Sequence, residues 1–136
     1  MTEPAYAPRY GYVRHLAGRR LADARAIVTS ALKQEGFGIL TEIDVQATLK
    51  QKLNQEFRPY VILGACNPTL AHRALQSELG IGLLLPCNVC LWEDEGGVTV
   101  AIAKPDVMFE VVANPALEPV VREATAGIER ALGALQ

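Results

Sequence analysis

The sequence predicts a single α+β domain in which helices pack on one face of a mainly antiparallel sheet. The chain has 136 residues, of which 50% are hydrophobic and 21% are charged, as in an ordinary globular domain. Segments with strand and helix periodicity alternate along most of its length. A charged loop with two glycines at 93–97 then joins two apolar segments, which is typical of an antiparallel hairpin. We assign residues 1–9, which include two prolines, to a loose N-terminal arm and residues 10–136 to the domain.

The first part of the domain is expected to form strand, helix and strand. Residues 10–16 are rich in aromatic and β-favouring residues and predict a strand. A helix follows, since apolar residues then recur on one helical face, at Leu21, Ala24, Val28, Ala31 and Leu32. Gly36 lies where a glycine would end this helix, and residues 37–43 predict the next strand.

The middle of the chain contains two predicted helix starts. Asp44 is a plausible N-cap for a short helix whose apolar residues recur at Val45, Leu49 and Leu53. After a brief buried strand over 60–63, Asn67 is expected to cap another helix. Pro68 suits its first position because the missing N–H would be unpaired there anyway.

The last part is expected to contain a strand hairpin and a long helix. Residues 82–92 predict a long strand in which Pro86 implies a bulge, a sheet edge or a strand that begins after it. Its partner is predicted over 98–103. Residues 104–113 are ambiguous, because Pro105 can open a short helix or simply end the strand. Apolar periodicity from Leu117 onward predicts an amphipathic terminal helix.

Composition narrows the classes of function. A net charge of −2 and a pI near 5.7 argue against a dedicated nucleic-acid binder. The longest apolar run, 81–85, is too short to span a bilayer, and residues 1–8 lack the apolar core of a signal peptide. Three cysteines in such a chain indicate reduced thiols. We therefore expect a cytoplasmic protein with no membrane or nucleic-acid partner.

Basic side chains are concentrated near the first predicted helix, at Arg14, Arg19, Arg20 and Arg25. This group is either a solvated helix edge or a patch for an anion or a partner protein. The sequence leaves both interpretations open.

Cys66 is the residue that the sequence singles out for chemistry. It directly precedes the predicted N-cap Asn67, where unpaired amides and the positive end of the helix dipole favour a thiolate over a thiol. The same amides are suited to a carboxylate or phosphate oxygen, so a small anionic ligand is expected here. Cys87 approaches Cys66 if the two strands that precede and contain them are neighbours. The alternative is that both are inert packing thiols.

Other candidate motifs are discounted. Cys87 and Cys90 have the spacing of a redox or zinc pair, but side chains three apart on a strand point to opposite faces, and no second ligand pair follows. We therefore predict no metal and no cofactor, and interpret Cys90 as a small buried hydrophobe. His15 and His72 have no triad context and are expected at the surface or a strand edge.

Two blocks resemble the bacterial domain of unknown function 302 family. They are Leu63–Pro68 with Ala71, and Gly82–Val89; residues 36–45 and 49–53 are similar to the family's upstream half, so agreement runs from about 36 to 103. The resemblance implies a curved antiparallel sheet like that of the TATA-binding-protein-like class, often assembled as a homodimer. It implies no reaction. Transferring the blocks residue by residue selects Cys66, Asn67, Pro68, Pro86 and Cys87 as the ligand-binding candidates.

Three functions remain open. The first is a dimeric binding module whose pocket, formed by the Cys66 helix start and the Pro86–Cys87 strand, holds a small anionic or thiol-reactive ligand. The second is a redox sensor or enzyme that uses Cys66 as nucleophile and Cys87 as resolving thiol. The third is a structural dimerisation domain. Because no general base is evident near Cys66, the sequence favours binding over catalysis.

Overall fold

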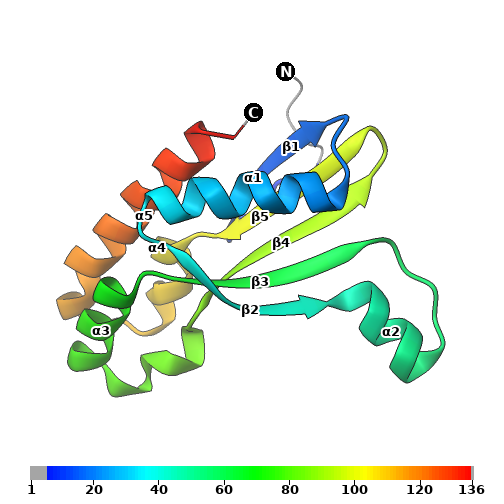
Figure 1. Cartoon of the computed structure of the whole chain (residues 1–136). Helices are drawn as coiled ribbons and strands as arrows, with labels where there is room; N and C mark the ends of the chain where they lie inside the picture. The colour runs from blue at the N-terminus through cyan, green and yellow to red at the C-terminus, as the bar shows by residue number, and fades with distance from the viewer. Residues whose placement is uncertain (1–5, 136) are drawn as a thin grey trace.

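The computed structural model describes residues 6–135 and contains a five-stranded sheet in the order β1-β5-β4-β3-β2 (Figure 1). All four neighbouring strand pairs are antiparallel, which confirms the predicted α+β class and the predicted sheet type. The strands are β1 (Gly11–Ala17), β2 (Gly38–Asp44), β3 (Tyr60–Cys66), β4 (Cys87–Asp94) and β5 (Gly97–Ala103).

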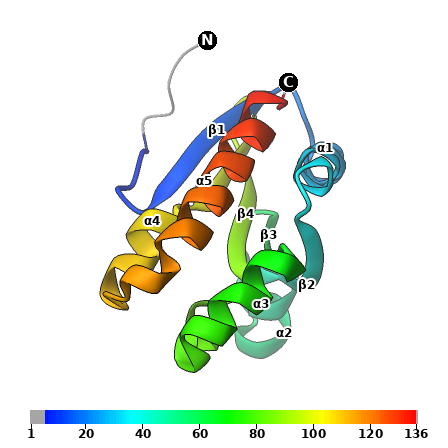
Figure 2. The ribbon, with the colours of Figure 1, turned by 90° about the vertical axis from the view of Figure 1, so that its left-hand side faces the viewer.

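Helices cover one face of this sheet, as predicted. The helices are α1 (Leu21–Gln34), α2 (Val45–Leu53), α3 (Pro68–Ser77), α4 (Pro105–Met108) and α5 (Glu118–Gly133). Buried side chains of α1, α3 and α5 join the strands in one hydrophobic core. Figure 2 shows α1 on one side of the sheet and the segment that precedes β1 on the other. The second face of the sheet carries none of α1, α3 and α5, and the short α4 lies at its border.

Alternation along the three central strands supplies the core. On each of them every second residue faces the helices and is almost fully buried. These residues are Val61, Leu63 and Ala65 on β3, Val89 and Leu91 on β4, and Val98, Val100 and Ile102 on β5. Since burial of a valine or leucine side chain contributes about 1.5–3 kcal/mol, this face fixes the register of the sheet.

The predicted helix boundaries are confirmed by their capping contacts. The Asp44 carboxylate accepts a hydrogen bond from the Ala47 amide at 2.9 Å and caps α2. The Asn67 side chain accepts one from the Leu70 amide at 3.1 Å and caps α3. Gly36 has a φ of +86°, the left-handed conformation that glycine adopts readily at a helix end.

The predicted strand over 82–92 is wrong in its first part. Leu79–Leu84 instead forms a 3-10 helix, and β4 begins only at Cys87. The reason is local, because Pro86 has no N–H to donate to the strand ladder. Of the alternatives for Pro86, a strand that begins after it is the correct one. Pro105 opens the short helix α4, which settles the other ambiguous segment.

Helix α2 is unlike the other long helices because none of its residues is buried. In Figure 1 it extends beyond the body of the domain at the far end of β2. Leu53, at its end, is 63% exposed, and Phe57, in the loop that follows, is 43% exposed. Of the apolar residues that predict this helix, Val45 and Leu49 are only half-buried, so the described residues of the chain cover it in part.

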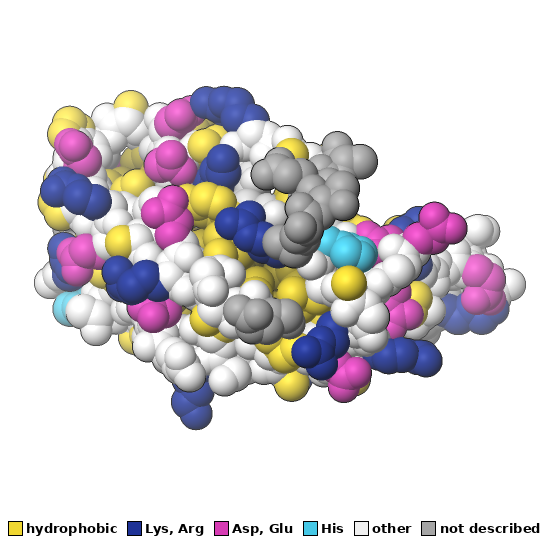
Figure 3. All heavy atoms as spheres, turned by 90° about the horizontal axis from the view of Figure 1, so that it is seen from above, with side chains coloured by type: hydrophobic (Ala, Val, Ile, Leu, Met, Phe, Trp, Pro, Cys, Tyr) yellow, Lys and Arg dark blue, Asp and Glu magenta, His cyan; other side chains and the backbone are white. Residues whose placement is uncertain are grey.

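The basic side chains near α1 do not form a patch of one sign. Arg25 forms an ion pair with Glu42 of β2, and Arg20 lies 4.0 Å from a carboxylate oxygen of Glu93. Figure 3 shows acidic and basic side chains interspersed over the top of the molecule. Within residues 6–135, no helix has both the length and the apolar composition required to cross a membrane.

Candidate functional site

The helix-free face of the sheet is hollowed because its central residues are small. On β5, large residues point to the helices, whereas Thr99, Ala101 and Ala103 alternate with them and point to the other side. Cys90 of β4 is the cross-strand partner of Ala101 and is also small. Three methyl- or thiol-sized side chains next to one another leave space above the strands that no helix fills.

A cavity of about 460 Å³ lies over this surface, within the usual size range of small-molecule sites. Its walls come from three places: the segment before β1, the segment between α3 and β4, and the region around α4. The main lining residues are Tyr6, Tyr10, Tyr60, Leu83, Pro86, Cys87, Asn88, Cys90, Trp92, Ala101, Ala103, Met108 and Phe109. Two of the five predicted ligand-binding residues, Pro86 and Cys87, are among them.

Aromatic rings form one end of the cavity. Tyr60 and Trp92 are cross-strand partners, and their rings stack with centroids 5.3 Å apart and an interplanar angle of 11°. The Tyr6 ring lies against Trp92 at 6.5 Å with a tilt of 58°. Such contacts are worth about 0.5–1.5 kcal/mol beyond the burial of the rings, so they hold the residue 6–10 segment on the sheet.

Further contacts attach this segment at its other end. The Lys104 amide donates to the Tyr10 carbonyl at 2.9 Å, and the Arg9 guanidinium donates to both carboxylate oxygens of Glu110 at 3.1 and 2.9 Å. The ion pair is exposed and contributes little on its own. Residues 1–5 of the predicted arm lie outside the described residues.

The cavity is electrically neutral. Among the described residues that line it there is no Lys, Arg, Asp or Glu. Burial raises the pKa of Tyr60, and the hydrogen bond between the Tyr60 hydroxyl and Cys90 raises it further. Burial also raises the pKa of the Cys90 thiol. Both groups are consequently protonated near neutral pH, and the walls offer apolar surface with a few uncharged polar atoms.

The other three predicted residues, Cys66, Asn67 and Pro68, lie at a different place. Cys66 ends β3, while Asn67 and Pro68 begin α3 as predicted. Cys66 and Asn67 line a second cavity of about 30 Å³ between α3 and α5, which adjoins the first because Cys87 lines both. That volume is about the share of one water molecule in the liquid and is too small for an organic ligand.

The predicted acidity of Cys66 is wrong. Burial raises the pKa of the Cys66 thiol, the opposite of the expected effect of the helix start. One amide of that start is already occupied by the Asn67 side chain, and desolvation disfavours the thiolate. Cys87 lines the same small cavity, and burial together with the nearby Cys66 raises the pKa of its thiol. The two cysteines are therefore close together, but both are predominantly thiols.

Cys87 and Cys90 occupy alternate sides of β4. Cys87 lies on the same side of β4 as the buried Val89 and Leu91. Cys90 lies on the same side as Trp92, on the hollow face, which is the face of the sheet that carries the larger cavity. In the part of the chain that the structure describes, no three His, Cys, Asp or Glu side chains are grouped to hold a metal ion.

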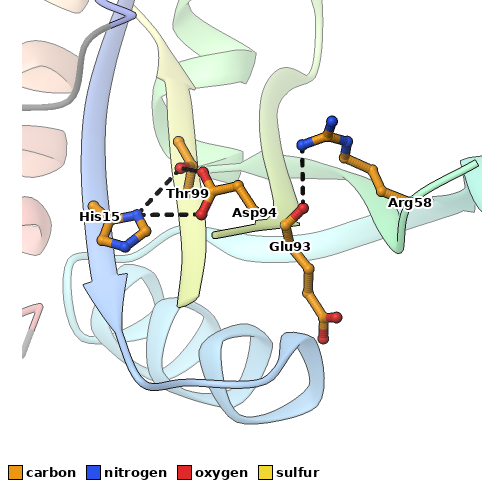
Figure 4. A network of polar contacts seen from close by, with 5 residues as sticks. All are labelled: His15, Arg58, Glu93, Asp94 and Thr99. Carbon is orange, nitrogen blue, oxygen red and sulfur yellow. Dashed lines mark hydrogen bonds and ion pairs between the residues drawn. The ribbon is translucent and has the colours of Figure 1, made fainter. Parts of the chain in front are cut away.

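Near the hairpin between β4 and β5, His15 belongs to a polar cluster that the sequence did not reveal. Its Nδ1 lies 3.4 Å from the Thr99 hydroxyl and 3.5 Å from the Asp94 carboxylate (Figure 4). Thr99 is 5% exposed and donates its hydroxyl to Asp94. The neighbouring Glu93 points the other way and accepts a hydrogen bond from the Leu21 amide at the start of α1. Strand register, not sequence spacing, assembles this cluster.

Sequence reasoning also missed the aromatic and small residues of the cavity. Tyr60, Trp92, Ala101 and Ala103 lie on three different strands, and their proximity depends on strand order. One signal was available: the alternation of large and small residues over 97–103 predicts one face of β5 that is filled and one that is not.

Comparison with known proteins agrees with this fold. The model of the family described as domain of unknown function DUF302 matches residues 14–135. The crystal structure of an uncharacterized conserved DUF302 protein from Bacillus stearothermophilus superimposes with a TM-score of 0.85 at 27% sequence identity, covering 95% of this chain and 100% of that one. No curated protein matches the sequence.

Proposed function

This chain belongs to the domain of unknown function DUF302 family, and from that premise we propose that it is a binding module for a small molecule held in the cavity on the helix-free face of the sheet. The observation that supports the proposal most strongly is the cavity itself, about 460 Å³ in volume and walled by side chains from three separate segments. Protein interiors are closely packed, so a sheet face whose only role was to pack against the segments above it would carry side chains larger than alanine and cysteine.

The cavity replaces the Cys66 region as the place where we locate the ligand. Pro86 and Cys87 stay in the proposed site. Cys66, Asn67 and Pro68 support it from outside, since they form the end of β3 and the start of α3. The proposed ligand is also not the anion expected from the sequence, because the described lining residues include no cation to neutralise a negative charge.

Filling the cavity tests this proposal. Ala101→Leu adds a side chain above the centre of β5 without changing the helix-covered face. Ala26→Leu, at an exposed position of α1, adds the same side chain elsewhere and is the matched control. We expect a library of small uncharged and charged compounds to yield ligands that raise the thermal midpoint of the wild type and of Ala26→Leu but not of Ala101→Leu. Ligands that stabilise Ala101→Leu equally would contradict the proposed location.

We propose further that the module is a homodimer through β2 and α2. Strand β2 is an edge of the sheet, and Leu40 and Ile43 on it are 65% and 50% exposed. Isolated helices shorter than about 12–15 residues are marginal in water, so the nine-residue α2, none of whose residues is fully buried, would be stabilised by a further packing surface. An unpaired edge and a partly covered helix next to each other are suited to a second copy of the same region.

Light scattering coupled to size-exclusion chromatography tests the assembly. We expect twice the mass of the chain for the wild type and a single mass for the double variant Ile43→Lys with Leu53→Lys. Leu79→Lys, at a leucine that is 85% exposed but far from β2 in sequence and not on the sheet, should stay dimeric. A monomeric wild type would overturn this part of the proposal.

A thiol sensor is the second candidate, and the proximity of Cys66 and Cys87 supports it. Oxidation would join their sulfurs, while two protons and two electrons pass to an oxidant such as hydrogen peroxide. The raised pKa values of both thiols slow this step, because the thiolate is the reactive form. Intact mass after peroxide treatment should show the loss of two hydrogen atoms, absent in Cys66→Ser and present in Cys90→Ser. Retention of all thiols under peroxide would exclude it.

A further inference from the structure

We infer that the ligand of this cavity is a neutral, planar aromatic molecule that carries a hydrogen-bonding group, of the kind represented by indole or phenol. The inference rests on the proposed function and goes beyond it, since a cavity on this face could in principle be built for an ion, a lipid chain or a polymer. Four features of the walls select among these classes.

The first feature is the ring surface at one end of the cavity. Tyr6, Tyr60 and Trp92 present their rings from two strands and from the segment before β1. Met108 at the end of α4 and Phe109 directly after it also line the cavity. Offset and edge-to-face contacts between aromatic groups are favourable beyond their buried area, so these walls discriminate in favour of a flat ring over an aliphatic group of equal size.

The second feature is the absence of charge. A carboxylate or phosphate buried without a cation carries a large desolvation penalty, and the described lining residues supply no cation. The titratable lining residues do not change this, since burial raises the pKa of Tyr60, Cys87 and Cys90 and keeps them protonated. A single-stranded nucleic acid, which also stacks on aromatic side chains, needs a basic groove along its backbone and does not fit these walls.

The third feature is the flat floor. Ala101, Ala103 and Cys90 are of similar size and lie on neighbouring strands, so they form an even surface beneath the cavity. A planar molecule contacts such a floor over its whole face. A bulky, three-dimensional molecule contacts it at a few atoms only, and therefore gains less dispersion energy.

The fourth feature is a small number of uncharged polar groups. Asn88 lies opposite Gly64 of β3, where the Thr41 hydroxyl and Pro86 fill the space that a side chain would take. Asn88 is exposed and lines the cavity. Tyr60, which is half-buried, lines it as well. A few directional donors and acceptors on an otherwise apolar wall are how small-molecule sites orient their ligands. A ligand N–H, hydroxyl or carbonyl would be matched here.

The protein contains its own reporter for the test. Trp92 is the one tryptophan of the sequence, so its indole N–H gives a single side-chain signal in a nitrogen-15 correlation spectrum. We would titrate the protein with three probes of comparable size: indole, its anionic counterpart indole-3-carboxylate, and the saturated, neutral cyclohexylmethanol. Affinities come from calorimetry, and the location comes from the Trp92 signal and from the variants Ala101→Leu and Ala103→Leu, with Ala26→Leu as control.

We expect indole to bind and to shift the Trp92 signal, and both other probes to bind at least about tenfold more weakly, a difference of about 1.4 kcal/mol. Either cavity-filling variant that keeps the wild-type circular dichroism should lose indole binding. The anion or the saturated probe could instead bind as tightly as indole or more tightly, and lose binding in the same variants. That result would overturn the ligand class but not the proposed function. Failure of all three probes to shift Trp92, together with no ligand from the compound library, would overturn both.

Discussion

The two faces of the sheet are made by the same strands and have opposite properties. On the helix-covered face of β4 and β5, Val89, Leu91, Val98, Val100 and Ile102 are at most 2% exposed. On the other face the same strands carry Cys90, Trp92, Ala101 and Ala103 around an open cavity. This difference indicates that the helix-covered face provides most of the stability of the sheet, whereas side chains on the other face can vary to suit a ligand. Substitutions at adjacent positions should therefore have very different consequences.

The sharpest test of this contrast uses two neighbours on β4. Leu91→Ala removes a side chain that is fully buried under the helices, and we expect it to lower the free energy of unfolding by about 2–5 kcal/mol. Cys90→Ala, one residue away on the hollow face, should cost about 1 kcal/mol or less, since it removes a small, half-buried thiol that faces the cavity. Urea unfolding of both variants measures the difference. Equal losses would contradict the distinction between the faces.

A second test concerns the place where the hollow face is tightly packed. A Cβ added at Gly64 would lie 2.6 Å from Pro86 Cγ and closer still to the Thr41 hydroxyl, so Gly64→Ala should cost about 1–3 kcal/mol. Gly38 is also on a strand, but nothing lies within 4 Å of the corresponding position. Gly38→Ala is therefore the control and should be close to neutral in thermal or urea unfolding.

A third test examines the polar end of the hollow face. Thr99→Val keeps the shape of the side chain but removes the hydroxyl that donates to Asp94, leaving that carboxylate with His15 alone. We expect a loss of about 1–2 kcal/mol, because one oxygen of Asp94 is already buried without a hydrogen bond. The double variant Thr99→Val with Asp94→Asn should recover part of this loss. A double-mutant cycle of unfolding free energies would show whether it does.

The smallest expected effect is a dependence on alkaline pH. Burial raises the pKa of Cys87 in the folded state, so stability is complete below its ordinary value of about 8.5 and falls as pH rises through the raised value. Unfolding midpoints measured between neutral and alkaline pH should decline for the wild type. The decline should be shallower for Cys87→Ala, and a decline of unchanged steepness would exclude this thiol as its cause.

Local patterns were enough to predict most of the fold. The N-caps at Asp44 and Asn67, the glycine at the end of α1 and the amphipathic face of α5 depend on residues a few positions apart, so sequence spacing reveals them. The strand predicted over 82–92 was wrong in its first part, where apolar composition is the same for a strand and for a 3-10 helix. Periodicity alone does not separate the two over so short a run.

The candidate site was predicted only in part, because its residues meet through strand order. Pro86 and Cys87 were identified by the family resemblance, but the sequence placed them with Cys66 around a helix start. The structure places Pro86 in a cavity of about 460 Å³ and Cys66 in one of about 30 Å³, and Cys87 lines both. The acidity predicted for Cys66 failed for a related reason: the helix dipole can be inferred from spacing, whereas desolvation depends on what packs around the sulfur.

By itself, the sequence determined which residues form strands and helices and which side of each strand could enter a core, since both follow from periodicity and capping between near neighbours. Only the tertiary structure decided that Tyr60 stacks on Trp92, that Tyr6 closes over the same ring, and that no residue of α2 is fully buried. Those outcomes depend on contacts between residues tens of positions apart, and the free energy of such contacts is set by the packing of the whole chain.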